Sequence, residues 1–192
     1  MRRNRIDVLL TLALVLSALS FSCGGGGGGG GGGPVGLTAT FTPTNANPPA
    51  GTVSLQPGAS NGPSFSIEVR VQDPTNFMGT SFHLTFATAS ATFVSMSSAN
   101  SFIAGAGITT DFHAQLDSTP GVLLLDAERI GQVQGATGVG SQLLMTLNFR
   151  ATAATAGNTF GFNSTQVTTC PAPPAACTDS VGSFSGGLLT AN

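Results

Sequence analysis

Tryptophan, tyrosine and lysine are all absent from the 192-residue sequence, and charged residues make up only 7% of it. The missing lysine excludes the phosphate-binding lysine of P-loop proteins and the lysine Schiff base of several enzyme classes. After residue 22 the chain holds three arginines against seven acidic residues, a formal charge of −4. Because so few cations cannot neutralise many backbone phosphates, the composition argues against nucleic acid as a partner.

The absent residue types and motifs also argue against two other functions. Carbohydrate-binding modules usually stack sugars on Trp or Tyr rings, which this sequence does not have. The segment that comes nearest to a Gly-x-Ser-x-Gly nucleophile motif, residues 182–186, has Phe184 at its centre. Asp126 and Glu128 could serve as paired carboxylates for glycoside hydrolysis, but nothing in the pattern indicates a cleft. We therefore expect a protein that is not an enzyme and uses no cofactor.

The N-terminal residues have the order of parts found in an export signal. Arg2, Arg3 and Arg5 precede a mostly apolar run at residues 8–19, which is too short to span a bilayer. Residues 19–23, Leu-Ser-Phe-Ser-Cys, then resemble a bacterial lipoprotein lipobox, with Ser20 where leucine is commonest. These features predict a signal peptide at residues 1–22 and a lipid on Cys23. The alternative is an ordinary secretory signal cut nearby, which would leave Cys23 as a free thiol.

Ten consecutive glycines follow Cys23, at residues 24–33. Polyglycine has no side chains to bury and a high backbone entropy, so we expect residues 23–36 to act as an unfolded linker. Gly24 stands where an aspartate holds some bacterial lipoproteins at the inner membrane. By this resemblance we expect the outer membrane or the cell surface. Residues 37–192 are then one domain of ordinary size.

The domain sequence alternates between apolar and polar residues, as half-buried β-strands do. Residues 64–72 show this most clearly, residues 122–130 repeat it, and residues 141–151 place four apolar side chains on one face: Leu143, Met145, Leu147 and Phe149.

Turn signals separate the remaining segments. We expect a turn at residues 57–63, two short strands at 159–162 and 165–169, and a closing strand at 181–189. About nine strands without a convincing amphipathic helix predict an all-β fold, a single jelly-roll or immunoglobulin-like sandwich.

Two sets of side chains are candidates for covalent or metal chemistry. Cys170 and Cys177 are left as a pair in an exported protein, and we expect them to form a disulfide around a proline-rich loop. Asp111 and His113 share one strand face, as do Asp126 and Glu128. If their strands were adjacent, these four could approximate a metal site, although we favour a solvated polar face without a metal.

The order of the strand motifs resembles that of cohesin domains. The resemblance covers residues 37–190 and rests on five segments. They are Phe65-Ser-Ile-Glu-Val-Arg-Val-Gln72, Met78-Gly-Thr-Ser-Phe-His-Leu-Thr-Phe86, Gly121-Val-Leu-Leu-Leu-Asp126, residues 137–149 and, as a looser match, Gly157-Asn-Thr-Phe-Gly-Phe162. The family's usual Tyr-Asp-Pro after the second segment is Phe86-Ala87-Thr88 here, and the Cys170–Cys177 loop is additional.

This resemblance implies a non-catalytic recognition module. Cohesins are nine-stranded jelly-roll sandwiches that bind dockerin modules through one sheet face and so assemble polysaccharide-degrading complexes. We therefore expect a dockerin-like protein partner and a membrane contact through the lipid anchor only. Two alternatives stay open: a sandwich that binds polysaccharide, and a structural or adhesion domain without a specific ligand.

Overall fold

The computed structural model describes residues 36–173 and 175–192, so the predicted signal peptide and Cys23 lie outside it. Twelve strands and no helix occur in the described residues. In chain order the strands are β1 (Ala39–Pro43), β2 (Thr52–Asn61), β3 (Ser64–Gln72), β4 (Phe77–Thr85), β5 (Ala91–Ser97), β6 (Thr109–Leu116), β7 (Val122–Ile130), β8 (Ser141–Ala151), β9 (Thr155–Thr169), β10 (Thr178–Ser180), β11 (Ser183–Ser185) and β12 (Gly187–Ala191).

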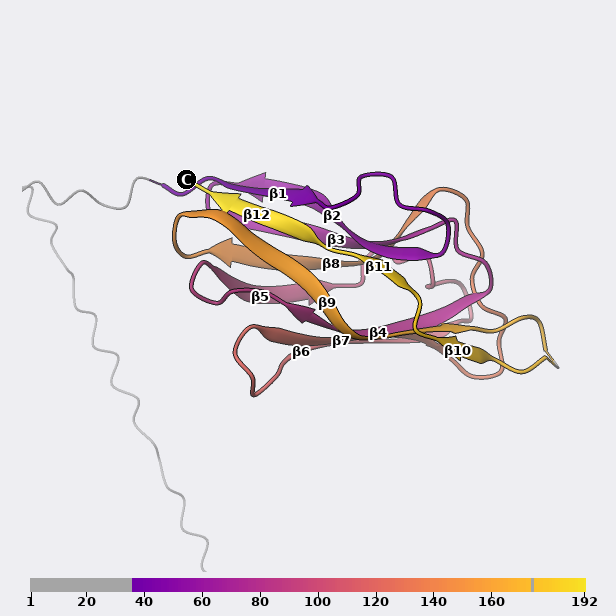
Figure 1. Ribbon diagram of the computed structural model, residues 1–192. Coiled ribbons are helices and arrows are strands. Elements are labelled where there is room, and N and C mark those ends of the chain that lie inside the picture. Colours follow the sequence, from indigo (N-terminus) through magenta and orange to yellow (C-terminus); the bar gives the residue numbers. More distant parts are fainter. Residues whose placement is uncertain (1–35, 174) are drawn as a thin grey trace, which may run out of the picture. The chain divides into compact units, whose positions relative to one another are not determined.

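The strands form two sheets that pack face to face (Figure 1). The larger sheet has the order β1-β12-β9-β4-β7-β6, with β10 paired to β9. The smaller sheet has the order β11-β2-β3-β8-β5. Only β11 and β2 run parallel among the pairs that the structure describes. The expected all-β sandwich is confirmed, with more strands than the predicted nine.

Strict alternation places one face of each central strand in the core. Along β3, Phe65, Ile67, Val69 and Val71 are buried, and on β7 the buried residues are Leu123, Leu125 and Ala127. Removing these side chains from water is the main favourable contribution to the free energy of folding, at about 1.5–3 kcal/mol for each large side chain.

Phenylalanine rings join the two sheets. Phe149 of β8 lies 5.1 Å from Phe160 of β9, and both rings also contact Phe86, which follows β4. Edge-to-face contacts of this kind add stability beyond the buried area. The rings therefore form one cluster that connects opposite sheets.

Bulges account for most differences from the predicted strands. The turn expected at residues 57–63 is wrong, because β2 continues to Asn61 with a register shift between Pro57 and Ser60. A second shift, in the pairing of β3 with β8, puts Leu144 in the core and leaves Leu143 half-buried outside it. An extra residue changes which face the following side chains occupy, so strict alternation predicted the wrong leucine.

The C-terminal third also differs from the predicted strands. The two strands expected at 159–162 and 165–169 are one strand, β9, which bends at an irregularity in its pairing with β4. The single closing strand expected at 181–189 is two strands in different sheets, β11 and β12. Among the described residues no helix is long and apolar enough to cross a membrane.

Candidate recognition face

The outer face of β9, β4, β7 and β6 gathers two histidines and three carboxylates of the domain. Register explains the grouping, because Asp111 lies opposite Glu128 and His113 lies opposite Asp126. On the other side of β7, Ser81 lies opposite Asp126 and His83 opposite Leu124. We call this surface the acidic face and define it by six residues: Ser81, His83, Asp111, His113, Asp126 and Glu128.

The carboxyl groups of the acidic face influence one another. Burial raises the pKa of Asp126, and the Asp111 carboxylate adds to that rise, whereas the Ala127 N–H and His113 oppose it. Burial also raises the pKa of Glu128, with further contributions from Asp126 and Asp111. Nε2 of His113 lies 3.7 Å from Oδ2 of Asp111. The three carboxylates therefore lie close enough to repel one another when they are ionised.

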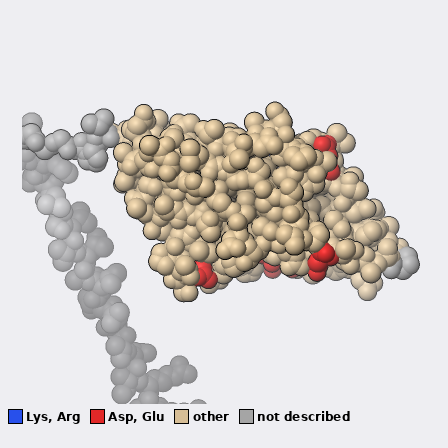
Figure 2. All heavy atoms as spheres, viewed as in Figure 1, with Lys and Arg blue, Asp and Glu red and all other residues tan. Residues whose placement is uncertain are grey.

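The arginines of the domain lie away from the acidic face. Nε of Arg129 donates to the carbonyl of Ile103, at 2.7 Å. Arg70 donates to Glu68 on the smaller sheet, and Arg150 lies on β8 of that sheet. The view in Figure 2 accordingly shows acidic atoms along the margins of the domain and no arginine. A binding partner would thus meet an anionic surface.

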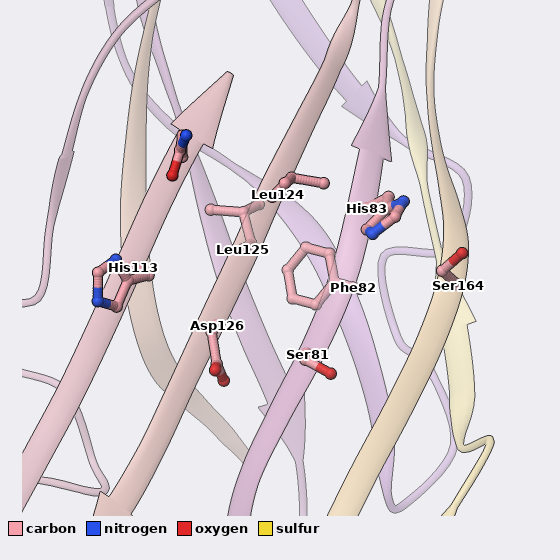
Figure 3. Close-up of a pocket in the computed structure, with 9 residues that line it drawn as sticks. Ser81, Phe82, His83, His113, Leu124, Leu125, Asp126 and Ser164 are labelled. Atoms are coloured by element: carbon pink, nitrogen blue, oxygen red, sulfur yellow. The ribbon is translucent and has the colours of Figure 1, made fainter. Parts of the chain in front are cut away.

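Two hollows indent the acidic face, one on each side of the Ser81–Asp126 pair. The first, of about 270 Å³, has His83 on one side and His113 on the other, with Leu124 between them (Figure 3). The second, of about 210 Å³, lies between Asp126 and Glu128 on one side and Gln166 and Thr168 on the other.

A glycine and a bulge shape these hollows. Gly79 faces the second hollow, and a Cβ there would lie 2.6 Å from the carbonyl oxygen of Ala127. Ser164 borders the first hollow at the irregularity of β9, with a positive φ of 51°. A bulge re-aims the side chains around it, which is why bulges often border binding sites.

The four metal candidates do come from adjacent strands, as the metal hypothesis required. Asp111 and His113 on β6 share the acidic face with Asp126 and Glu128 on β7. Within residues 36–173 and 175–192, however, no group of three or more His, Cys, Asp or Glu side chains is arranged to hold a metal ion. These four residues therefore form a charged surface and not a metal site in the described part of the chain.

The structure describes two of the three cysteines for which the sequence made a prediction. Cys170 and Cys177 form a disulfide in the structure, with their Cα atoms 4.2 Å apart. The backbone of Cys170 also contacts the β3–β4 and β7–β8 connections, because its N–H donates to the carbonyl of Asn76 and its carbonyl accepts from the Gly135 N–H. Cys23, the predicted lipidation site, lies outside the described residues.

Four further residues that line the hollows were not predicted from the sequence. Gly79, Gln166, Thr168 and Ser164 come from two strands that are 70 or more residues apart in the chain. The outward pattern of Ser81 and His83 was visible in the sequence, but no local signal shows which strand lies beside them. Long-range pairing alone brings β9 to β4.

The fold of the described residues is similar to that of solved cohesin modules. A type II cohesin domain from the cellulosome of Acetivibrio cellulolyticus is similar, with a TM-score of 0.51 and 12% sequence identity over 81% of this chain and 95% of that one. The sixth cohesin of scaffoldin B from the same organism, solved in complex with a Cel5 dockerin mutant, has a TM-score of 0.49 and 12% identity, covering 80% and 96% of the two chains.

The type II cohesin domain has the higher TM-score of these two structures. At this level of identity it establishes the architecture of the chain, which is a cohesin-like domain in fold. No protein-family model matches the sequence, and no curated protein matches it.

Proposed function

We propose that this domain is a non-catalytic protein-recognition module that binds a dockerin-type partner through the acidic face. The observation that carries the proposal is the grouping of Asp111, Asp126 and Glu128 on one outer face, where Asp126 and Glu128 border the hollows and no arginine lines either of them. The motif order of the sequence and the type II cohesin fold support the same class of function.

Charge complementarity indicates what the partner's surface must offer. Three carboxylates on adjacent strands attract a cationic surface, and opposite charges at an interface speed association and suppress wrong partners. The two hollows lie along the strand direction and would accept two projecting side chains of the partner. The proposed partner is therefore a module that presents basic side chains, and binding should weaken as salt is added.

A charge-reversal experiment tests this proposal. The full chain is assayed against a panel of purified type I and type II dockerins at low salt, as wild type and as Glu128→Lys, with Thr146→Lys as matched control. Thr146 lies on the outer face of the smaller sheet, so the control introduces a lysine away from the acidic face, with a charge change of +1 against +2 for Glu128→Lys. Binding that is lost in Glu128→Lys and kept in the control supports the proposal. The absence of any dockerin binding, or equal loss in both variants, contradicts it.

We further propose that the module is displayed at the outer membrane or cell surface by a lipid on Cys23, as part of a polysaccharide-degrading or cell-surface assembly. The lipobox-like residues 19–23 and the glycine run at 24–33 support this proposal. Intact-mass analysis after expression in a lipoprotein-processing bacterium tests it. A mature chain that begins at a diacylated Cys23, in the outer-membrane fraction, is the expected result. Unmodified protein in the soluble fraction would overturn the anchor but leave the recognition proposal standing.

A further inference from the structure

Another hollow lies on the outer face of the smaller sheet, opposite to the acidic face. This hollow, of about 400 Å³, extends over β2, β3, β8 and β5. We call it the trough and define it by six of its lining residues: Ala59, Ser64, Ser66, Val94, Ser95 and Asn148. Its volume is in the range of small-molecule sites.

Two bulges form the sides of the trough. Ala59 lies in the irregular part of β2, between the paired residues Pro57 and Ser60. Val94 is the extra residue of β5, between Phe93 and Ser95, and 61% of it is exposed. The regular β3–β8 pair between them forms the floor. Bulges on both flanking strands, on the same face, are a built feature of the sheet.

The floor and one side present hydrogen-bonding groups that the fold holds in place. Asn148 Nδ2 donates to Ser95 Oγ at 3.0 Å, across the β8–β5 register pair. The Ser66 hydroxyl donates to the carbonyl of Ala59 at 3.1 Å. The first bond uses one amide hydrogen and one hydroxyl lone pair, so the Asn148 carbonyl oxygen and the Ser95 hydroxyl hydrogen are left for a ligand.

The chemistry of the lining is neutral. The trough is lined by hydroxyl, amide and apolar groups, and none of its lining residues is charged. Glu68 is paired with Arg70 further along β3, and Arg150 lies opposite Ser64 at the other end. A strongly charged ligand would therefore lose its hydration without meeting a counter-charge among the lining residues, since Arg150 is exposed at the rim beside Ser64.

An extended peptide fits the trough poorly, because the backbone groups of β3 are already paired with β2 and β8. A ligand must be recognised by side chains, and it must offer both hydroxyl groups and a small apolar surface for Val94. Neutral sugars have this combination.

We propose that the trough binds a neutral hexose unit of a glycan. Asn148, Ser95 and Ser64 hydrogen-bond its hydroxyl groups, and Val94 contacts its C–H face. Without a Trp or Tyr ring to stack on, the affinity is modest, in the millimolar range expected for a ligand of this size. The site lies on the opposite sheet from the acidic face, so it stands independently of the proposed dockerin partner.

Nuclear magnetic resonance titration of the full chain tests the proposal, with cellotetraose and maltotetraose as neutral probes and tetragalacturonate as the charged probe. Saturable shifts of the Asn148 side-chain amide and of the Ser64 and Ser95 backbone amides are expected with at least one neutral probe. Shifts confined to other parts of the domain, or no saturable shift with either neutral probe, would overturn it. A stronger response to tetragalacturonate would also overturn it.

Two variants make the test specific. Asn148→Leu should weaken binding of the responding probe about tenfold or more, the usual result of removing a positioned polar partner of a ligand hydroxyl. Ser95→Ala, which changes only one exposed hydroxyl, provides the same test if Asn148→Leu does not fold. Ser183→Ala is the matched control, because Ser183 is exposed on β11 of the same sheet and does not line the trough, and it should bind as wild type does. Equal binding by Ser95→Ala and wild type would contradict the proposed contacts.

Discussion

The side-chain amide of Asn158 hydrogen-bonds both backbone polar groups of Ala87. Its Oδ1 accepts from the Ala87 N–H at 2.8 Å, and its Nδ2 donates to the Ala87 carbonyl at 2.9 Å and to the Ser90 hydroxyl at 2.9 Å. Asn158 is 3% exposed, on β9, and Ala87 lies in the connection between β4 and β5. One buried side chain thus fixes a link between the two sheets, since β4 and β5 belong to different ones.

Replacing Asn158 with alanine should destabilise the domain by about 2–4 kcal/mol, because it leaves the polar groups of Ala87 without these partners. Urea unfolding followed by circular dichroism measures the change. The neighbouring Thr159 is exposed, and Thr159→Ala should change stability by about 0.5 kcal/mol or less. Similar losses in the two variants would show that the amide network contributes little.

Phe149→Ala should destabilise by about 3–5 kcal/mol, the range for deleting a buried aromatic ring. The ring of Phe149 contacts Phe65, Phe86, Phe93 and Phe160 with centroid distances of 5.1–5.6 Å. Thermal and urea unfolding measure the loss. Val94→Ala on the adjacent strand β5 serves as the control, because Val94 is largely exposed and its truncation should be close to neutral.

Gly79→Ala should be destabilising although it adds a single methyl group. The new Cβ would lie 2.6 Å from the Ala127 carbonyl oxygen and 2.8 Å from Glu128 Cβ, which forces β4 and β7 apart. Overpacking of this kind costs about 1–3 kcal/mol. At Gly105 the nearest atom, Cγ1 of Ile108, is 3.5 Å away, so Gly105→Ala is the tolerated counterpart. Urea unfolding of the two variants measures the difference, and equal unfolding midpoints would contradict the predicted clash at Gly79.

Asp126→Asn should change how stability depends on pH. The pKa of Asp126 is raised in the folded state, so between its unfolded and folded pKa values the folded protein binds the extra proton. Wild-type stability from this group therefore falls as the pH rises through that window, which begins near about pH 4. The variant has no carboxyl group to ionise, so its stability relative to wild type should increase between acidic and neutral pH.

Asp73→Asn should show the opposite trend. Hydrogen bonds from the Gly140 N–H and from Gln72 lower the pKa of Asp73. A carboxyl group whose pKa is lowered by folding stabilises the folded state at pH values above its ordinary pKa, and this contribution is lost as the pH falls. The deficit of the variant should therefore shrink on acidification. Urea unfolding of both variants and wild type across the acidic range checks the two signs, and parallel curves would contradict both assignments.

Much of the strand framework could be read from the sequence because alternation is a local property. The bounds of β3, β7 and β8 follow from runs of apolar and polar residues, and the phenylalanines of those runs form the core. A side chain that must leave water selects its face of the strand wherever the partner strand is. The fold class was predictable for this reason.

Bulges and strand pairing were decided by tertiary structure. Leu144, not Leu143, enters the core because β8 must adjust its register to β3, and no local pattern marks that adjustment. The acidic face likewise depends on β7 lying between β4 and β6. Asp126 and Ser81 are 45 residues apart in the chain and become neighbours only through cross-strand hydrogen bonds. The sequence by itself determined which side chains face outward, whereas the pairing of distant strands decided which of them lie together.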